Sequence, residues 1–223
     1  MKIFKSGFTM AEVLAALLIV GVIAILVLPM LVKNMQKQQS VAILGRAVDQ
    51  IQTGNQNIIQ FANVNRTNGS YSNTLSSVNM SDLISGQGQT SILLDFEDVI
   101  PAYWGLVPFD GNLLPIKDFS GNEESTDAQR VDAGTRFSFS KFPGMVAISG
   151  NIANIDSINS ADRITDIFVY IDTNGWDRRP NIAGKDVFAF QLRNDGTLRP
   201  AFGTDAGDYA DQVLQSGYRI NYY

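Results

Sequence analysis

The chain has 223 residues, of which 45% are hydrophobic and 17% charged, and it contains neither cysteine nor histidine. These absences exclude a disulfide, a cysteine nucleophile, a histidine general base and a Cys/His zinc site. The formal net charge is −5, and it would become −7 without the two lysines of the first seven residues, so we expect no general binding of nucleic acid. The length suits one membrane segment and one folded domain.

The N-terminal region contains an apolar run long enough to cross a membrane. From Val13 to Val32 there is no charged or polar side chain over 20 residues. As an α-helix this run would be about 30 Å long, which matches the thickness of a bilayer core. The basic leader MKIFKSG comes before it and ends in a small residue, Gly7. An ordinary secretory signal has its small-residue cleavage site after the apolar region instead.

Glu12, at the N-terminal edge of this run, has two interpretations. Thr9 and Glu12 have the S/T-x-x-E spacing of a capping box, in which each side chain bonds the backbone N–H of the other residue. A carboxylate beside an apolar run also favours a cationic partner, because it costs about 2.5–3.5 kcal/mol at the centre of a membrane and less at its edge. Both interpretations stay open.

The segment KSGFTMAEVLAALLIVGVIAILVLP resembles the leader and first half-helix of type IV pilins and of the pseudopilins of type II secretion. The resemblance covers about 30 residues and rests on a short basic leader, an aromatic residue after it and a glutamate five residues beyond the cut. Met10 replaces a more usual Leu. The residues that carry the resemblance are Gly7, Phe8, Thr9, Glu12, Gly21 and Pro29.

The resemblance implies a processing pathway and a set of partners. A prepilin peptidase would cut after Gly7 and N-methylate Phe8, and Glu12 would then pair with the Phe8 amine of a neighbouring subunit. The precursor would span the bacterial inner membrane once, with its leader in the cytoplasm. An inner-membrane assembly platform would then build copies of the chain, or other pilins, into a pilus (fimbrium) or pseudopilus in the periplasm or at the cell surface.

Two residues inside the apolar run are expected to soften the helix. Pro29 lacks a backbone donor and its ring opposes the carbonyl four residues earlier. Together with Gly21 it marks the stretch where we expect a kink or local unwinding. The small side chains of the run would allow close packing against copies of the same helix.

The helix is expected to continue beyond the membrane as an amphipathic half-helix over residues 33–62. Apolar residues recur there at alternating steps of three and four, which predicts one buried stripe against the sheet of a head domain. Asn55 interrupts this stripe, whose other members are Val41, Leu44, Val48, Ile51, Ile58 and Ala62.

The rest of the chain predicts an α+β protein in which antiparallel strands pack on the long helix, a pilin-like layout. Alternating apolar and polar residues predict four strands, and Asn194-Asp195-Gly196 predicts a tight turn into a fifth. The expected strands are 135–142, 144–152, 166–172, 186–192 and 197–198. The predicted organisation is therefore a leader (1–7), a transmembrane and filament-core half-helix (8–32), the outer half-helix (33–62) and a β-rich head (63–223).

The sequence also predicts the structure of the segments that connect the strands. Trp104 lies among prolines and aromatic residues and is expected in the core. The remaining expectations are a loop over 63–79, short helices and extended pieces over 81–115, an exposed acidic loop over 117–133, a helix over 205–216 and an edge strand over 218–223.

A loop after the third expected strand gathers oxygen-bearing side chains. Asp172, Asn174, Asp177 and Asp186 are candidate Ca²⁺ ligands, although their spacing is not that of an EF-hand. The loop resembles one that recurs in prepilin-type proteins and, more loosely, the calcium loop of the major pseudopilins. The alternative is that the same side chains cap turns without a metal. No cofactor is required, and a structural Ca²⁺ remains one of two interpretations.

The sequence therefore predicts a structural protein, a prepilin subunit, rather than an enzyme. Neither a nucleophile elbow nor a phosphate-binding glycine loop is present in the sequence. The alternative function is a membrane-anchored extracytoplasmic enzyme or binding protein on a pilin-like stalk. The choice among a major pilin, a minor pilin and a pseudopilin stays open.

Overall fold

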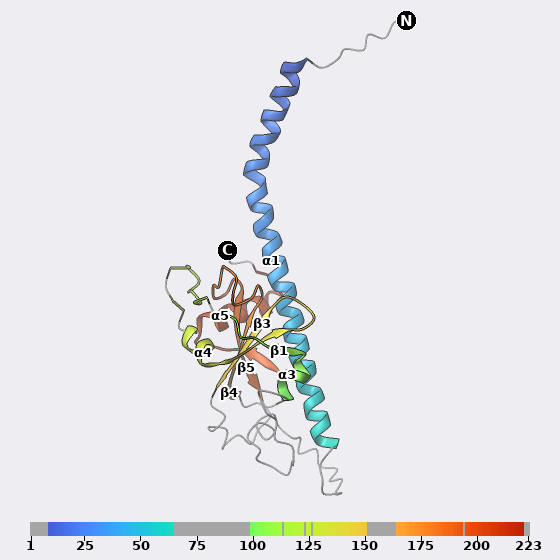
Figure 1. Cartoon of the computed structure of the whole chain (residues 1–223), viewed down its shortest axis with the longest axis vertical. Helices are drawn as coiled ribbons and strands as arrows, with labels where there is room; N and C mark the ends of the chain where they lie inside the picture. The colour runs from blue at the N-terminus through green and yellow to red at the C-terminus, as the bar shows by residue number, and fades with distance from the viewer. Residues whose placement is uncertain are drawn as a thin grey trace, which may run out of the picture. The chain divides into compact units, whose positions relative to one another are not determined.

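The computed structural model describes residues 9–64, 99–112, 114–122, 124–125, 127–150, 164–193 and 195–220. The chain divides into two compact units, Met1–Gln39 and Ser40–Tyr223. Figure 1 shows the elements in chain order: α1 (Met10–Val64), α3 (Val99–Trp104), β1 (Leu106–Pro108), α4 (Ala128–Ala133), β2 (Thr135–Phe139), β3 (Met145–Gly150), β4 (Ile164–Asp172), β5 (Val187–Arg193), β6 (Leu198–Pro200) and α5 (Asp205–Gln215).

Helix α1 is continuous over 55 residues and ends two residues beyond its predicted end. Gly21 and Pro29 both lie inside it without a break in the helix. Local unwinding is therefore not seen at these two residues, and their role as softening positions stays a prediction. Among the described helices, α1 is the one that is long and apolar enough to cross a membrane.

The head contains a six-stranded antiparallel sheet with the sequential order β1-β2-β3-β4-β5-β6. Val146 on β3 pairs with Ile171 on β4, which in turn pairs with Phe188 on β5. Because side chains alternate across a sheet, these three paired residues point to the same face. The prediction of an antiparallel sheet is confirmed, with short strands β1 and β6 at its two edges.

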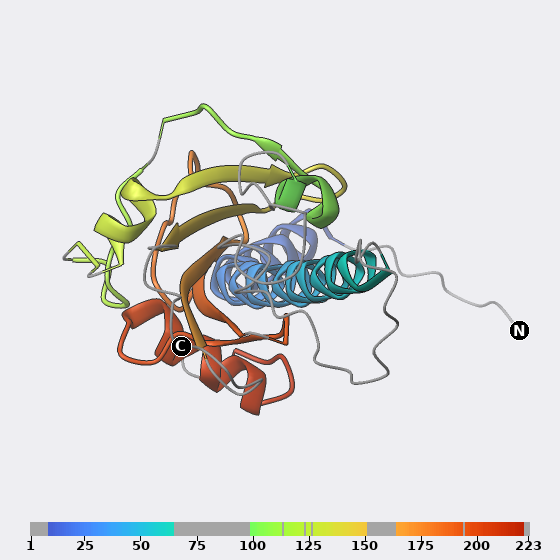
Figure 2. The same cartoon turned by 90° about the horizontal axis from the view of Figure 1, so that it is seen from below.

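One face of the sheet packs on the Ser40–Val64 part of α1. Figure 2 shows the strands curving along one side of this part of the helix. The predicted apolar stripe is buried in a single core cluster with side chains of the sheet, and the members of that cluster include Leu44, Val48, Ile51, Ile58, Phe137, Val146, Ile148, Val169, Ile171, Phe188 and Phe190. Trp104 is fully buried in the same cluster, as expected.

The opposite face of the sheet carries a second core cluster beneath the loops, α4 and the start of α5. Tyr170 on β4 and Trp176 in the following loop are fully buried there. The other members are Ile116, Ala128, Val131, Ala147, Ala183, Val187, Ala189, Ala201 and Ala206. The head therefore buries both faces of its sheet, and small alanine side chains let the covering segments approach closely.

Two expectations for the head were wrong. The segment 117–133 is not one exposed loop, because it ends in helix α4 and buries Ser125, Asp127 and Val131. Residues 218–220 are not part of a strand, and residues 221–223 lie outside the described residues. The expected helix over 205–216 is confirmed as α5, whose first turn is capped by the Thr204 side chain accepting from the Gly207 N–H. The loop predicted over 63–79 begins at the end of α1 and otherwise lies outside the described residues.

Candidate functional site

The N-terminus of α1 forms the predicted capping box. The backbone N–H and the hydroxyl of Thr9 both donate to Glu12 Oε2 at 2.8 Å. The Glu12 N–H donates in return to Thr9 Oγ1 at 3.3 Å. Gly7 and Phe8, the expected cleavage and methylation positions, lie outside the described residues. The pairing of Glu12 with a neighbouring amine therefore stays a prediction.

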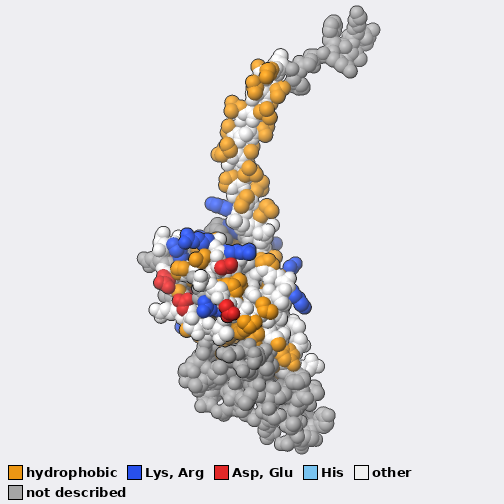
Figure 3. Space-filling model, viewed as in Figure 1, with side chains coloured by type: hydrophobic (Ala, Val, Ile, Leu, Met, Phe, Trp, Pro, Cys, Tyr) orange, Lys and Arg blue, Asp and Glu red, His pale blue; other side chains and the backbone are white. Residues whose placement is uncertain are grey.

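The surface of α1 between Val13 and Val32 is apolar on all sides. Figure 3 shows hydrophobic side chains around the whole visible surface of this stretch. Ile25 and Leu26 are each 73% exposed. A helix that is apolar all round is stable only where lipid or protein covers it. This stretch is thus a surface that needs a partner.

The loop between β4 and β5 begins with a turn organised by Asp172. Its Oδ1 atom accepts from the backbone N–H groups of Asn174 and Gly175, both at 2.9 Å. Gly175 has φ +106°, a conformation that side-chain-bearing residues rarely adopt. These bonds form the turn that the metal-free interpretation predicts.

Asp186 closes the same loop from its other end. Its Oδ1 atom accepts from the Ile182 N–H at 2.6 Å, and its Oδ2 atom accepts from Asn174 Nδ2 at 2.9 Å. The Asn174 amide also donates to the Pro180 carbonyl at 2.9 Å. Three of the four candidate ligands, Asp172, Asn174 and Asp186, are thus linked by hydrogen bonds, whereas Asp177 is exposed.

Two oxygen atoms of the candidate ligands are buried without a hydrogen-bond donor. They are Asp172 Oδ2 and Asn174 Oδ1, and the Asp172 residue is 0% exposed. Burial raises the pKa of Asp172 well above its usual value, and the nearby charges of Asp186 and Asp177 raise it further. Burial also raises the pKa of Asp186 to about 7. The loop therefore holds buried oxygen atoms in surroundings that disfavour the charged form of both carboxyls.

This chemistry fits a hard cation, which prefers carboxylate and amide oxygens. Among the described residues, no three Asp, Glu, His or Cys side chains converge on one point. A cation would therefore rely on the amide oxygen of Asn174 beside the two carboxylates of Asp172 and Asp186. Both the turn and the cation interpretations remain compatible with the geometry.

Asn181 belongs to this loop but was not among the four candidate ligands predicted from the sequence. Its Nδ2 atom donates to the carbonyls of Leu114 and Trp176, both at 3.0 Å. Its Oδ1 atom is buried without a donor. The Pro-Asn pair at 180–181 was the available signal, yet the partner Leu114 is 67 positions away in sequence.

A second polar cluster that sequence reasoning missed surrounds the buried Asp127. Tyr170 Oη donates to its Oδ1 at 3.0 Å, and the Ala206 N–H donates to its Oδ2 at 2.9 Å. Ser125 Oγ donates to Asp205 Oδ2 at 3.0 Å beside them. Burial is the main cause of the raised pKa of Asp127. These bonds join α4, β4 and the start of α5, so the cluster connects elements of the head.

Comparisons with protein-family models, with curated proteins and with solved structures give no match to this chain.

Proposed function

We propose that this chain is a prepilin subunit that is cleaved and N-methylated by a prepilin peptidase and assembled into a type IV pilus or a type II secretion pseudopilus. The observation that carries the proposal is the exposed apolar surface of α1 over Val13–Val32, directly after the capping box of Thr9 and Glu12. The resemblance of the N-terminal sequence to prepilins supplies the pathway.

The surface of α1 suits two alternative environments. In a bilayer its apolar side chains are covered by lipid, and in a filament they are covered by the same surface of other copies. Its small residues favour close helix packing, and a Cβ atom added at Gly21 would meet nothing within 4 Å in the described chain. These small residues are Ala11, Ala15, Ala16, Gly21 and Ala24.

The capping box is compatible with the proposed charge pair. Thr9 holds Oε2 of Glu12, while Oε1 accepts no hydrogen bond within the described part of the chain. One carboxylate can therefore cap its own helix and accept from the Phe8 amine of a neighbour at the same time. In this proposal the Glu12 side chain has both functions: it caps the helix and it pairs with the neighbouring amine.

The test is intact mass and N-terminal sequencing of the chain recovered from the envelope of its own host. We expect a mature chain that begins at N-methylated Phe8. The Gly7→Val variant is the control. A branched side chain before the cut should block cleavage, so the chain should keep its precursor mass. A wild-type chain that still begins at Met1 would contradict the proposal and favour a permanent anchor that carries an enzyme or binding protein.

We also propose that the β4–β5 loop holds a structural Ca²⁺. The specific support is the pair of buried oxygens without donors, Asp172 Oδ2 and Asn174 Oδ1, beside the carboxylate of Asp186. A divalent cation would neutralise the two aspartates and satisfy both oxygens. It would brace the 14-residue connection between β4 and β5 in a chain that has no cysteine for a disulfide.

A further inference from the structure

A distant segment of the chain, residues 114–122, lies along the β4–β5 loop, and we call it the covering segment. Lys117 of this segment and Ile182 of the loop form a parallel bridge. The Lys117 N–H donates to the Asn181 carbonyl at 2.8 Å, and the Ala183 N–H donates to the Lys117 carbonyl at 3.0 Å. The backbones of the loop and of the covering segment are therefore hydrogen-bonded to each other.

The side chain of Asn181 makes a second connection between the same two parts. Its Nδ2 atom donates to the carbonyls of Leu114 in the covering segment and Trp176 in the loop, both at 3.0 Å. The Leu114 N–H donates in turn to that Trp176 carbonyl at 3.0 Å. Asn181 is only 4% exposed, so its amide cannot exchange these partners for water unless the loop moves.

The two residues that flank Asn181 are held by candidate Ca²⁺ ligands. The Pro180 carbonyl accepts from Asn174 Nδ2 at 2.9 Å, and the Ile182 N–H donates to Asp186 Oδ1 at 2.6 Å. Asn181 thus lies between two backbone groups whose positions depend on the side chains of Asn174 and Asp186. A change in how those two side chains are held would reach the covering segment through Asn181.

Side-chain packing continues the contact beyond the backbone bonds. Ile116 of the covering segment belongs to the same core cluster as Trp176 and Ala183 of the loop. Farther along the segment, the Lys185 ammonium of the loop lies over the Phe119 ring, 4.8 Å from its centroid. The covering segment therefore depends on the conformation of the β4–β5 loop along much of its length.

We propose that cation binding at the β4–β5 loop orders the covering segment, and that Asn181 is the positioning residue that couples the two. The inference rests on the proposed Ca²⁺ site. Without a cation, the buried charges of Asp172 and Asp186 oppose each other, which favours local opening of the loop. A cation removes this opposition and holds the side chains of Asn174 and Asp186, and with them the backbone on each side of Asn181.

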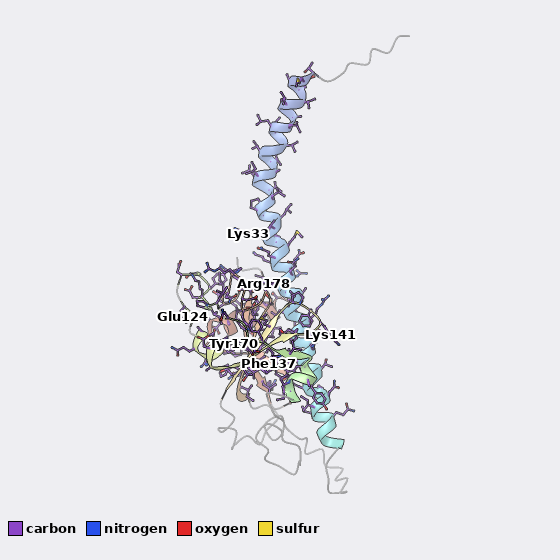
Figure 4. All side chains as sticks on the ribbon, viewed as in Figure 1. Lys33, Glu124, Phe137, Lys141, Tyr170 and Arg178 are labelled. Carbon is purple, nitrogen blue, oxygen red and sulfur yellow. The ribbon has the colours of Figure 1, made fainter. Side chains whose placement is uncertain are left out.

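Hydrogen exchange of the full chain in detergent, with excess Ca²⁺ or with chelator, tests the coupling. We expect Ca²⁺ to slow exchange in the covering segment by roughly five- to 150-fold, the usual range for coupling between two sites. The internal control is the Ser140 N–H, which donates to the Gly105 carbonyl at 3.0 Å and should exchange at an unchanged rate. Figure 4 shows Lys141, next to Ser140, on the opposite side of the head from Glu124, which bridges the covering segment.

The Asn181→Leu variant separates the coupling from the site itself. It removes both bonds of the side-chain amide and keeps the three candidate ligands that are linked by hydrogen bonds. We expect Ca²⁺ still to raise the melting temperature of this variant, whereas its effect on exchange in the covering segment should fall at least fivefold. Because coupling is reciprocal, the affinity for Ca²⁺ should fall as well.

Ser120→Ala is the matched control within the covering segment. It removes the bonds of the Ser120 hydroxyl to Asp118 and leaves every contact with Asn181 in place. Ca²⁺ should slow exchange in this variant as much as in the wild type.

The other outcomes overturn the inference in distinguishable ways. If Ca²⁺ raises the melting temperature but leaves exchange in the covering segment unchanged, the coupling is wrong and the Ca²⁺ site stands. Equal slowing at Ser140 would indicate a general gain in stability and would also overturn the coupling. Full slowing in Asn181→Leu would show that the ordering does not pass through Asn181. If Ca²⁺ changes neither quantity in the wild type, the site and the coupling both fail, and this result does not depend on whether the variant folds.

Discussion

The indole N–H of Trp104 donates to Asn55 Oδ1 at 2.8 Å, inside the hydrophobic core between α1 and the sheet. The same Asn55 amide donates to the Gly196 carbonyl at 2.7 Å, and the residue is 0% exposed. One polar side chain on α1 thereby forms hydrogen bonds with both the α3 tryptophan and the turn before β6. The interruption in the apolar stripe of α1 is the point at which the helix is joined to two distant segments of the head.

We expect Asn55→Leu to destabilise the head by about 2–4 kcal/mol. It leaves the Trp104 N–H and the Gly196 carbonyl buried without partners, and each such group costs about 1–3 kcal/mol. Urea unfolding of the full chain in detergent, followed by tryptophan fluorescence, measures this loss, because both tryptophans belong to the head. The exposed neighbour Gln56, which donates to the Asp195 carbonyl, is the matched control. Gln56→Leu should cost under about 1 kcal/mol, and an equal loss from both variants would contradict the assigned role of Asn55.

Gly54→Ala should also destabilise the head, here through a clash. A Cβ atom at residue 54 would lie 2.7 Å from Trp104 Cδ1 and 2.8 Å from the Tyr103 carbonyl oxygen. Overpacking of this kind costs about 1–3 kcal/mol, which outweighs the higher helix propensity of alanine. Gly21→Ala is the control in the same helix, since its Cβ would meet nothing within 4 Å. A head as stable as the wild type after Gly54→Ala would show that α3 can move away from α1 without cost.

Glu12→Gln should leave cleavage after Gly7 intact and reduce filament yield by roughly tenfold or more. The amine of a neighbouring Phe8 would then be buried among apolar helices without its counter-charge, which is strongly unfavourable. Thr9→Ala is the matched variant, because it removes the two bonds of the Thr9 hydroxyl, leaves the backbone bond to Glu12 Oε2 and keeps the carboxylate. We expect this variant to lose about 1 kcal/mol of helix stability. Its filament yield should fall much less than that of Glu12→Gln. If both variants lower the yield equally, capping rather than charge is the function of Glu12.

Calcium should raise the melting temperature of the full chain if the β4–β5 loop binds it. At a concentration one hundred times its dissociation constant, the cation would stabilise the head by about 2.7 kcal/mol, roughly 5–10 °C for a chain of this size. Asp172→Asn should abolish the shift, whereas Asp132→Asn, at an exposed position on α4, should keep it. A wild-type melting temperature that changes with neither Ca²⁺ nor chelator would favour the interpretation of the loop as a turn without a metal. Asp177→Asn then tests whether the exposed fourth candidate contributes.

The pH dependence of stability provides a separate measure of the same loop. The pKa of Asp186 is about 7 in the folded chain, and that of Asp172 is also raised, above unfolded values near 4. A folded state that holds these protons more tightly is most favoured below about pH 4, and this contribution is lost as the pH rises through about 7. Without Ca²⁺, the head should therefore lose stability between pH 5 and 8, by an amount on the order of 1–4 kcal/mol.

Two comparisons assign this pH effect to the loop. Asp186→Asn should flatten the loss between pH 5 and 8, because it removes the titrating carboxyl. The stabilisation by Ca²⁺ should be larger at pH 8 than at pH 5.5, since the cation competes with protons for the same oxygens. Unfolding midpoints measured across this range provide the check. A wild-type profile that is flat without Ca²⁺ would contradict the raised pKa values.

Much of the fold could be predicted from the sequence because it depends on local patterns. The apolar run and the three-and-four spacing predicted α1, and alternation along residues 166–172 and 186–192 predicted β4 and β5. The Thr9 and Glu12 spacing predicted their capping bonds, which join residues three apart. In these cases the interacting groups are neighbours in the chain, so the residue types alone determine the geometry.

The burial of the 117–133 segment depended instead on distant partners. Its acidic composition predicted exposure, yet Asp127 is buried beneath Tyr170 and Ala206, 43 and 79 positions away. A polar side chain can be buried when its hydrogen bonds are made elsewhere in the fold. No local pattern indicated those donors.

The sequence by itself determined that this chain has an apolar helix of membrane length, a capped N-terminus with a carboxylate, and an α+β head whose helix buries one stripe. Hydrophobic periodicity carries that information, because it depends only on which side of each element must leave water. The tertiary structure decided which buried polar groups meet. Asn55 and Trp104 are 49 positions apart, and Asn55 and Gly196 are 141 apart. Their pairing follows from sheet register and helix packing, which bring remote donors and acceptors within hydrogen-bond distance.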